Sequence, residues 1–420
     1  CGTTSSHEME LTLTRADRRR ARAHAPGAHR TDVDGLRALA IALVVVYHVW
    51  FGRVSGGVDV FLMVSAYFLT LTVVRRVEAD GSFTTLLGFW ARRFARLLPA
   101  AAAVIAATLL IVRLWFPASD WPSIWRQAWA SLFYVQNREL TAIAVDYYSR
   151  DGLSPLQHFW SLSVQGQVFI LWPLLILAVI GLSRRCGWDA RRALCAAFAA
   201  VFAASLAYSI VHTANHQEAA YFSTLARLWE FAFGSLLALA AARLRPSAGW
   251  AALIGWVGVA GIVSCGAVLD VQGGFPGYLA LWPLLSAGGV MVAGCTPTRL
   301  GPGALLSSRP LRWLGSIAYP LYLVHWVILV AVLTITEQTA LGPLAGAGVI
   351  LASVAAAWVL ARLVERPART RAERGTRSAT VVVVASALVV AVPLAGWHVW
   401  CGALAAMAGG GDGTLPGDTD

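Results

Sequence analysis

Arg37 and His48 are ionisable residues inside one apolar stretch, residues 36–52. An ionised side chain in the hydrocarbon core costs about 2.5 to 3.5 kcal/mol on insertion scales, so such residues are candidates for function. The eleven-residue spacing is about three helical turns, which places both side chains on nearly one face, about 16 Å apart. We expect Arg37 to bind an anion and His48 to accept a proton in one channel. A snorkelling arginine and a packed histidine are the alternatives.

Two further arginines, Arg93 and Arg96, lie three positions apart at the start of another apolar stretch. Residues with this spacing share a helix face, and two guanidinium groups so placed suit the oxygens of a phosphate. Anchoring of a membrane helix by cations is the simpler alternative.

Polar residues also mark the beginning of the stretch 157–181. They are His158, Ser161, Ser163, Gln165 and Gln167. Polar groups in a membrane span usually face a cavity or a partner helix, and we expect the same here.

Ionisable and aromatic residues recur in two later stretches. Arg227 and Glu230, three positions apart, are interpreted most simply as an internal ion pair. Tyr319, Tyr322 and His325 repeat at three-residue spacing along one helix face. Packing in an interfacial aromatic belt is the simpler interpretation of these three.

The elements that position these residues are apolar stretches long enough to cross a bilayer. Of 420 residues, 58% are hydrophobic and 13% charged, and the mean hydropathy is +0.64, whereas soluble domains carry about a quarter charged residues. We predict an all-α integral membrane protein with about eleven transmembrane helices. The predicted spans are 36–52, 56–74, 97–116, 157–181, 194–213, 224–243, 250–268, 278–296, 314–336, 341–363 and 379–400.

The cationic residues predict the topology of these spans. All 33 are arginines, and 25 of them lie in loops on one side of the predicted bundle. The loops on the other side hold only Arg53, Arg126, Arg138 and Arg150. By the positive-inside rule, the N-terminus is cytoplasmic and the C-terminus extracytoplasmic. Charge distributed between apolar stretches argues against a nucleic-acid binder.

Cysteine spacing gives no sign of a metal or disulfide site, because the six cysteines form no CxxC pair. We expect residues 1–31 to form a disordered basic cytoplasmic tail and 117–156 to form a long outer loop with a tryptophan-rich interfacial segment. A cytoplasmic loop and an additional helix follow over 368–400. Residues 401–420 resemble an outer linker, and we expect a further domain beyond it.

Seven segments occur together in an order that resembles one family. They are TDVDGLRALAIALVVVYHVW (31–50), GGVDVFLMVSAYFLT (56–70), FWARRFARLLPA (89–100), SPLQHFWSLSVQGQVFILWP (154–173), YFSTLARLWEFAFGSLLA (221–238), WLGSIAYPLYLVHW (313–326) and VERP (364–367). Over residues 32–367 the chain resembles the membrane acyltransferase-3 family.

Members of that family are usually ten-helix enzymes that move an acyl group from cytoplasmic acyl-CoA to a hydroxyl of a cell-surface glycan, glycolipid or peptidoglycan sugar. The resemblance implies that Arg37, Arg93 and Arg96 bind acyl-CoA, often acetyl-CoA, and that His48 is the general base. It also implies a multi-pass protein of the bacterial plasma (inner) membrane, without a metal. A common subgroup adds an eleventh helix before an outer SGNH-type domain, which the span 379–400 fits.

The sequence departs from the family pattern in two places. Gln165 and Gly166 stand where the family usually has two glutamates, and Ala66 follows Ser65 where the family usually has glycine. The first departure removes both carboxylates from the motif. Asp34 or Asp59 is then a candidate for the missing acid.

Three functions remain open. An acyltransferase would use His48 as base, with Gln165, Ser163 or Tyr322 holding the histidine or donating to the oxyanion. A proton-coupled transporter would use Arg37, His48, Arg227, Glu230 and His325 as its relay. A catalytically silent member would act as a scaffold, as the lost glutamates indicate.

Overall fold

The computed structural model describes residues 30–53, 55–143, 153–241, 243–268, 274–296 and 298–409, except for the side chains of residues 400–409. All the regular secondary structure in these ranges is helical. Residues 1–29 of the predicted tail and residues 410–420 of the predicted linker therefore lie outside the described residues, whereas residues 401–409 continue a helix where the linker was predicted. Within the tail, only Arg30 and Thr31 are described, and Thr31 already begins a helix.

The first half of the chain forms α3 (Thr31–Val46), the π-helix η1 (Tyr47–Phe51), α4 (Gly57–Ala79), α5 (Phe83–Trp115), the 3-10 helix η2 (Ala118–Asp120), α6 (Trp121–Leu132), α7 (Gln136–Ala142), α8 (Phe159–Cys186) and α9 (Ala190–Asn215). The second half forms α10 (Gln217–Phe222), α11 (Thr224–Ala240), α12 (Ala248–Val268), α13 (Leu281–Ala293), α14 (Gly303–Leu306), α15 (Arg309–Ser316), α16 (Ala318–Thr336), α17 (Pro343–Leu360), the π-helix η3 (Ala361–Glu365), α18 (Arg366–Ala372) and α19 (Thr376–Gly409).

Each predicted span corresponds to a helix, which confirms the polytopic helical bundle. Nine helices of the described ranges are long and apolar enough to cross a membrane. The other two predicted spans are α11, with 17 residues, and α13, with 13. Both belong to the bundle, since α11 packs against α4 and α9, and α13 packs against α12. The cytoplasmic side of the bundle stays a prediction.

The segment predicted as an outer loop is more ordered than expected. Its residues form α6 and α7, which pack against α5 and α8 and bury Trp125. Two polar residues of this segment make hydrogen bonds inside the bundle, because the Gln136 amide donates to Gln127 and the Asn137 amide donates to the Phe222 carbonyl. The described part of this segment therefore holds two helices, of which α6 packs against α5 and α7 packs against α8.

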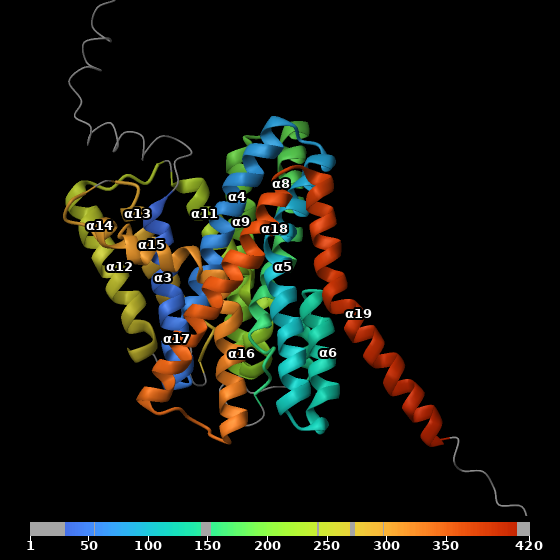
Figure 1. Cartoon of the computed structure of the whole chain (residues 1–420). Coiled ribbons are helices and arrows are strands. Elements are labelled where there is room, and N and C mark those ends of the chain that lie inside the picture. Colours follow the sequence, from blue (N-terminus) through green and yellow to red (C-terminus); the bar gives the residue numbers. More distant parts are fainter. Residues whose placement is uncertain are drawn as a thin grey trace, which may run out of the picture.

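Two ends of the bundle matter for function (Figure 1). α3 begins at the upper side of the picture, and η1 continues it towards the lower side. We call the first end the arginine end, where Arg37, Arg93 and Arg96 lie, and the other the histidine end, where His48 lies. α19 runs alongside α5 and diverges from the bundle towards the histidine end.

Candidate functional site

A pair of buried histidines forms the centre of the histidine end. His48 comes from η1 and His325 from α16, and the two rings are nearly parallel, with centroids 5.3 Å apart and an interplanar angle of 8°. His48 Nδ1 lies 3.0 Å from His325 Nε2. Their side chains are 6% and 0% exposed, so the pair is shielded from bulk solvent. The face of α16 that was interpreted as an aromatic belt therefore points into the bundle, and the belt interpretation is wrong.

The hydrogen bonds assign the protons of this pair. His325 Nδ1 lies 3.0 Å from the Leu321 carbonyl, which can only accept, so that nitrogen carries a proton. His325 Nε2 in the neutral ring is then an acceptor, and His48 Nδ1 must donate to it. The remaining lone pair of neutral His48 lies on Nε2. This tautomer is the one that a general base requires.

Aromatic and polar side chains surround the pair. The Trp326 ring meets His48 edge-on, with centroids 4.9 Å apart. Tyr322 donates to the His158 carbonyl and Ser161 donates to the Tyr322 hydroxyl, both at 2.8 Å. His158 Nε2 lies 3.0 Å from the Leu323 carbonyl, which ties the start of α8 to α16. These contacts hold the wall around His48 in place.

The π-helix is the element that sets the position of His48. It breaks the regular α-helix at Tyr47 and ends at Gly52, whose φ of 59° lies in the left-handed region that favours glycine. Single π-helical turns occur frequently at functional sites. The eleven-residue spacing predicted an unbroken α-helix from Arg37 to His48 and gave no sign of this turn.

Three arginines gather at the arginine end. Arg37 comes from α3 and Arg93 and Arg96 from α5, and their guanidinium groups lie within electrostatic range of one another. Arg93 also stacks over the Phe169 ring at 4.1 Å, and its buried Nε has no hydrogen-bond partner among the described residues. Cations held together in this way favour a polyanionic ligand.

Two carboxylates accompany these arginines. Asp34 lies within electrostatic range of Arg37, and Glu365 lies within range of Arg37 and Arg96. Glu365 ends η3 and is 9% exposed. It was not among the predicted site residues, although the VERP segment that contains it was quoted for the family resemblance.

The position that departs from the family pattern has an unexpected neighbour. A Cβ atom at Gly166 would lie 2.2 Å from Cδ1 of Tyr134, so the tyrosine ring fills the space that a larger side chain would need. Burial raises the pKa of the Tyr134 phenol, which therefore stays protonated. Gln165 is half-buried on the same helix, α8. A glutamate at 166 thus requires Tyr134 to move, which the sequence did not reveal.

Two candidates have hydroxyl protons that are already engaged elsewhere. Ser163 donates to the Phe159 carbonyl at 3.1 Å and accepts from the backbone N–H of Gln136. Ser65 donates to the Leu62 carbonyl within its own helix. In this arrangement Ser163 joins α8 to α7, and its proton is not directed at an oxyanion.

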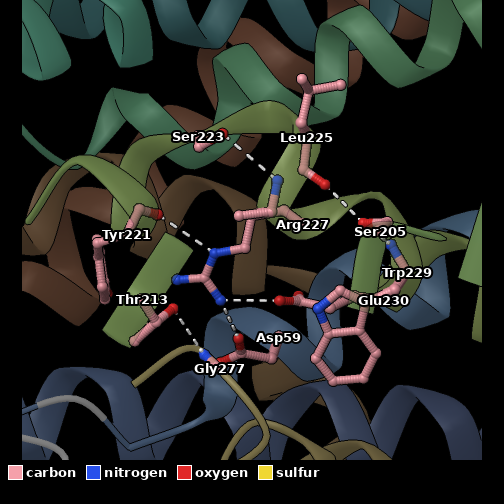
Figure 2. Close-up of polar contacts among 11 residues, drawn as sticks. Asp59, Ser205, Thr213, Tyr221, Ser223, Leu225, Arg227, Trp229, Glu230 and Gly277 are labelled. Atoms are coloured by element: carbon pink, nitrogen blue, oxygen red, sulfur yellow. Dashed lines mark hydrogen bonds and ion pairs between the residues drawn. The ribbon is translucent and has the colours of Figure 1, made fainter. Parts of the chain in front are cut away.

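A separate buried ion cluster links α4 to α11 (Figure 2). The Arg227 guanidinium lies between Asp59 and Glu230, with Nη1 at 2.6 Å from the first carboxylate and 2.8 Å from the second. Arg227 also donates through Nε to the Tyr221 carbonyl. The predicted Arg227–Glu230 pair is confirmed, and Asp59 is a third member that the sequence did not pair with it. One cation serves two carboxylates, all at most 2% exposed.

The comparisons with known proteins agree with this arrangement. Residues 30–362 match the acyltransferase-3 family model, which is described as an acyltransferase domain. The "Putative membrane-bound transacylase BcsY" of Komagataeibacter xylinus is 31% identical over 306 residues, which are 72% of this chain and 73% of that protein. The peptidoglycan O-acetyltransferase OatA of Listeria monocytogenes is 27% identical over 320 residues, 73% of this chain and 50% of the relative.

A shorter match covers the O-acetyltransferase OatA of Staphylococcus aureus, which is 35% identical over 147 residues. These residues are 34% of this chain and 24% of that protein. The chain thus spans about half the length of the Listeria relative, and its match spans about a quarter of the Staphylococcus relative. No solved structure matches the chain significantly.

Proposed function

Because the chain belongs to the acyltransferase-3 family, we propose that it transfers an acyl group from acyl-CoA to a hydroxyl of a cell-envelope glycan. The observation that carries the proposal is the His48–His325 pair, whose hydrogen bonds put the lone pair of His48 on Nε2. Relatives named as peptidoglycan O-acetyltransferases support a glycan as the acceptor.

The reaction is a direct transfer from a thioester to a hydroxyl. The acceptor oxygen attacks the thioester carbonyl carbon while its proton passes to Nε2 of His48. The new C–O bond forms, the C–S bond breaks, and the imidazolium returns the proton to the leaving thiolate. A positioned general base typically accelerates such a step by about 10²- to 10⁴-fold.

The arginine end supplies the binding site for the donor. The phosphates of coenzyme A would lie against Arg37, Arg93 and Arg96, whose mutual repulsion a polyanion relieves. Along the helix from Arg37, His48 lies about 16 Å away, so the pantetheine arm would extend through the bundle towards it. Donor and acceptor then approach the histidine from opposite ends.

The proposal is tested with the purified chain in nanodiscs and radiolabelled acetyl-CoA. His48→Ala should abolish transfer to glycan and keep coenzyme A binding. Arg93→Ala with Arg96→Ala should weaken coenzyme A binding by at least about 10²-fold, because two charge-assisted contacts are lost. Arg92→Ala is the matched control, since Arg92 lies on the same helix but donates to Thr376. Equal affinity in the double variant and the control would make these arginines topology anchors only.

The sidedness of the reaction is tested separately by cysteine labelling. Leu153 lies at the histidine end, so the thiol of Leu153→Cys should react with a membrane-impermeant reagent added from outside. Trp188 lies between α8 and α9 at the arginine end, so the thiol of Trp188→Cys should react only with reagent added from inside. Labelling of both from one side would contradict the predicted topology.

A catalytically silent family member is the second candidate, because Gln165 and Gly166 replace two glutamates of the family motif. Such a protein would bind coenzyme A at the arginine end and release no acyl product. Binding without transfer to any glycan acceptor in the same assay favours this second candidate.

A further inference from the structure

A cavity of about 400 Å³ opens at the histidine end and is lined by none of the residues around the histidine pair. Its lining comes from three separate segments of the sequence: residues 116–127, which include η2 and the start of α6, residues 153–154, and residues 330–339 at and after the end of α16. Small-molecule sites in proteins usually measure about 300 to 1,000 Å³, so its size suits a ligand such as one sugar ring.

The lining of this cavity is polar and acidic. Hydroxyl and amide groups come from Ser119, Ser123 and Gln127, and carboxylates come from Asp120 and Glu337. None of the lining residues within the described ranges is an arginine or a histidine. Apolar walls complete it, which suits the C–H face of a sugar while hydroxyls and carboxylates receive its O–H groups. Among the described lining residues, an anionic ligand would meet two carboxylates and no cation.

A short chain of contacts joins the cavity to the histidine pair. Ser154 lines the cavity, and its carbonyl accepts from the Trp326 indole at 2.9 Å. The same indole ring lies edge-on against His48. Ser154 and Gln136 both donate to the Gln127 amide oxygen, which holds this wall in place. The Trp326 indole therefore lies between the cavity wall at Ser154 and the candidate base.

From these contacts we propose that the cavity is the acceptor site and that it selects an uncharged or cationic sugar over a carboxylated one. The proposal rests on the proposed acyl transfer for its role, but its chemistry follows from the lining alone. Binding can therefore be measured without turnover.

The binding experiment compares N-acetylglucosamine with N-acetylmuramic acid, which is the same sugar carrying a lactyl carboxylate. Saturation-transfer NMR on the nanodisc protein should show the neutral sugar binding about tenfold more tightly at low salt. The preference should shrink as salt rises, because salt screens like-charge repulsion. Asp120→Asn with Glu337→Gln should remove it, and the fold should survive because both side chains are exposed. Equal or tighter binding of the acidic sugar overturns the proposal.

A cavity-filling variant locates the binding. Ser123→Phe should abolish binding of N-acetylglucosamine and transfer to it, while coenzyme A binding at the arginine end stays unchanged. Phe133→Trp, at the exposed end of α6, is the control that adds ring volume elsewhere. If the parent transfers acyl groups and Ser123→Phe transfers equally well, the cavity proposal fails and the proposed function stands. If the parent transfers nothing yet Ser123→Phe loses sugar binding, the proposed function fails and the sugar site stands.

Discussion

Replacing Gly166 by alanine tests the contact with Tyr134. The added Cβ would lie 2.2 Å from Cδ1 and 2.8 Å from Cγ of that ring, well inside van der Waals contact. Backbone hydrogen bonds restrain Tyr134, because its N–H donates to Ser131 and its carbonyl accepts from Gln167. The ring, packed edge-on against Phe94, must rotate to make room.

The magnitude follows from two opposing terms. Overpacking a well-packed site costs about 1 to 3 kcal/mol. Replacing glycine by alanine inside a helix stabilises the folded protein by about 0.5 to 1 kcal/mol when the added Cβ meets no other atom. Gly166→Ala should therefore be neutral or destabilising by up to about 2.5 kcal/mol. In a Tyr134→Ala background the clash is absent, and the same change should stabilise by about 0.5 to 1 kcal/mol.

The variants are ranked by their melting temperatures in one detergent. The melting temperature is measured as the loss of the monodisperse peak in size-exclusion chromatography after heating. Gly181→Ala is the matched control, because Gly181 lies on the same helix and an added Cβ meets nothing within 4 Å there. Gly181→Ala should stabilise the folded protein both in the parent and in the Tyr134→Ala background. If Gly166→Ala stabilises the parent as much as Gly181→Ala does, the tyrosine does not occupy that space and the reasoning is refuted.

Three other changes probe the two buried clusters and the altered motif. Gln165→Glu should raise acyl transfer on the order of 10²-fold if a carboxylate at this position assists the base, and an unchanged rate means that another group does so. His325→Ala should lower the rate of acyl transfer on the order of 10²-fold without changing coenzyme A affinity. His325→Gln should restore part of that rate, since the glutamine amide oxygen can accept the His48 Nδ1 proton. An equal loss of rate in both variants would contradict the tautomer assignment. Arg227→Met should cost about 3 to 5 kcal/mol of stability because it leaves two buried carboxylates without a cation, whereas Glu230→Gln should cost under about 1 kcal/mol. Similar melting temperatures for the two variants would refute the claim that one cation balances two buried carboxylates.

The sequence predicted the helices well because apolar length is a local property. Each predicted span corresponds to a helix, and the three arginines predicted to bind one anion do lie together. Local spacing also paired Arg227 with Glu230 correctly, since they share one helix.

Contacts between distant segments were not predictable in the same way. His48 and His325 were both candidates, but 277 positions separate them and no periodicity connects η1 to α16. Asp59 joins Arg227 across 168 positions for the same reason. Tyr134 was missed because its effect comes from filling space beside Gly166 rather than from a charge or hydrogen bond.

The π-helical turn at Tyr47–Phe51 makes the active centre sensitive to the number of residues as well as to their identity. Such a turn accommodates one residue more than an α-helical turn does, and each residue of an α-helix rotates the chain by about 100°. Deleting one residue just before His48 would let the helix become regular while every functional side chain remained present. The imidazole would then be carried around the helix, away from its partner on α16. Two homologues that differ by one residue in this turn would share the histidine and yet direct it to different sides of the helix.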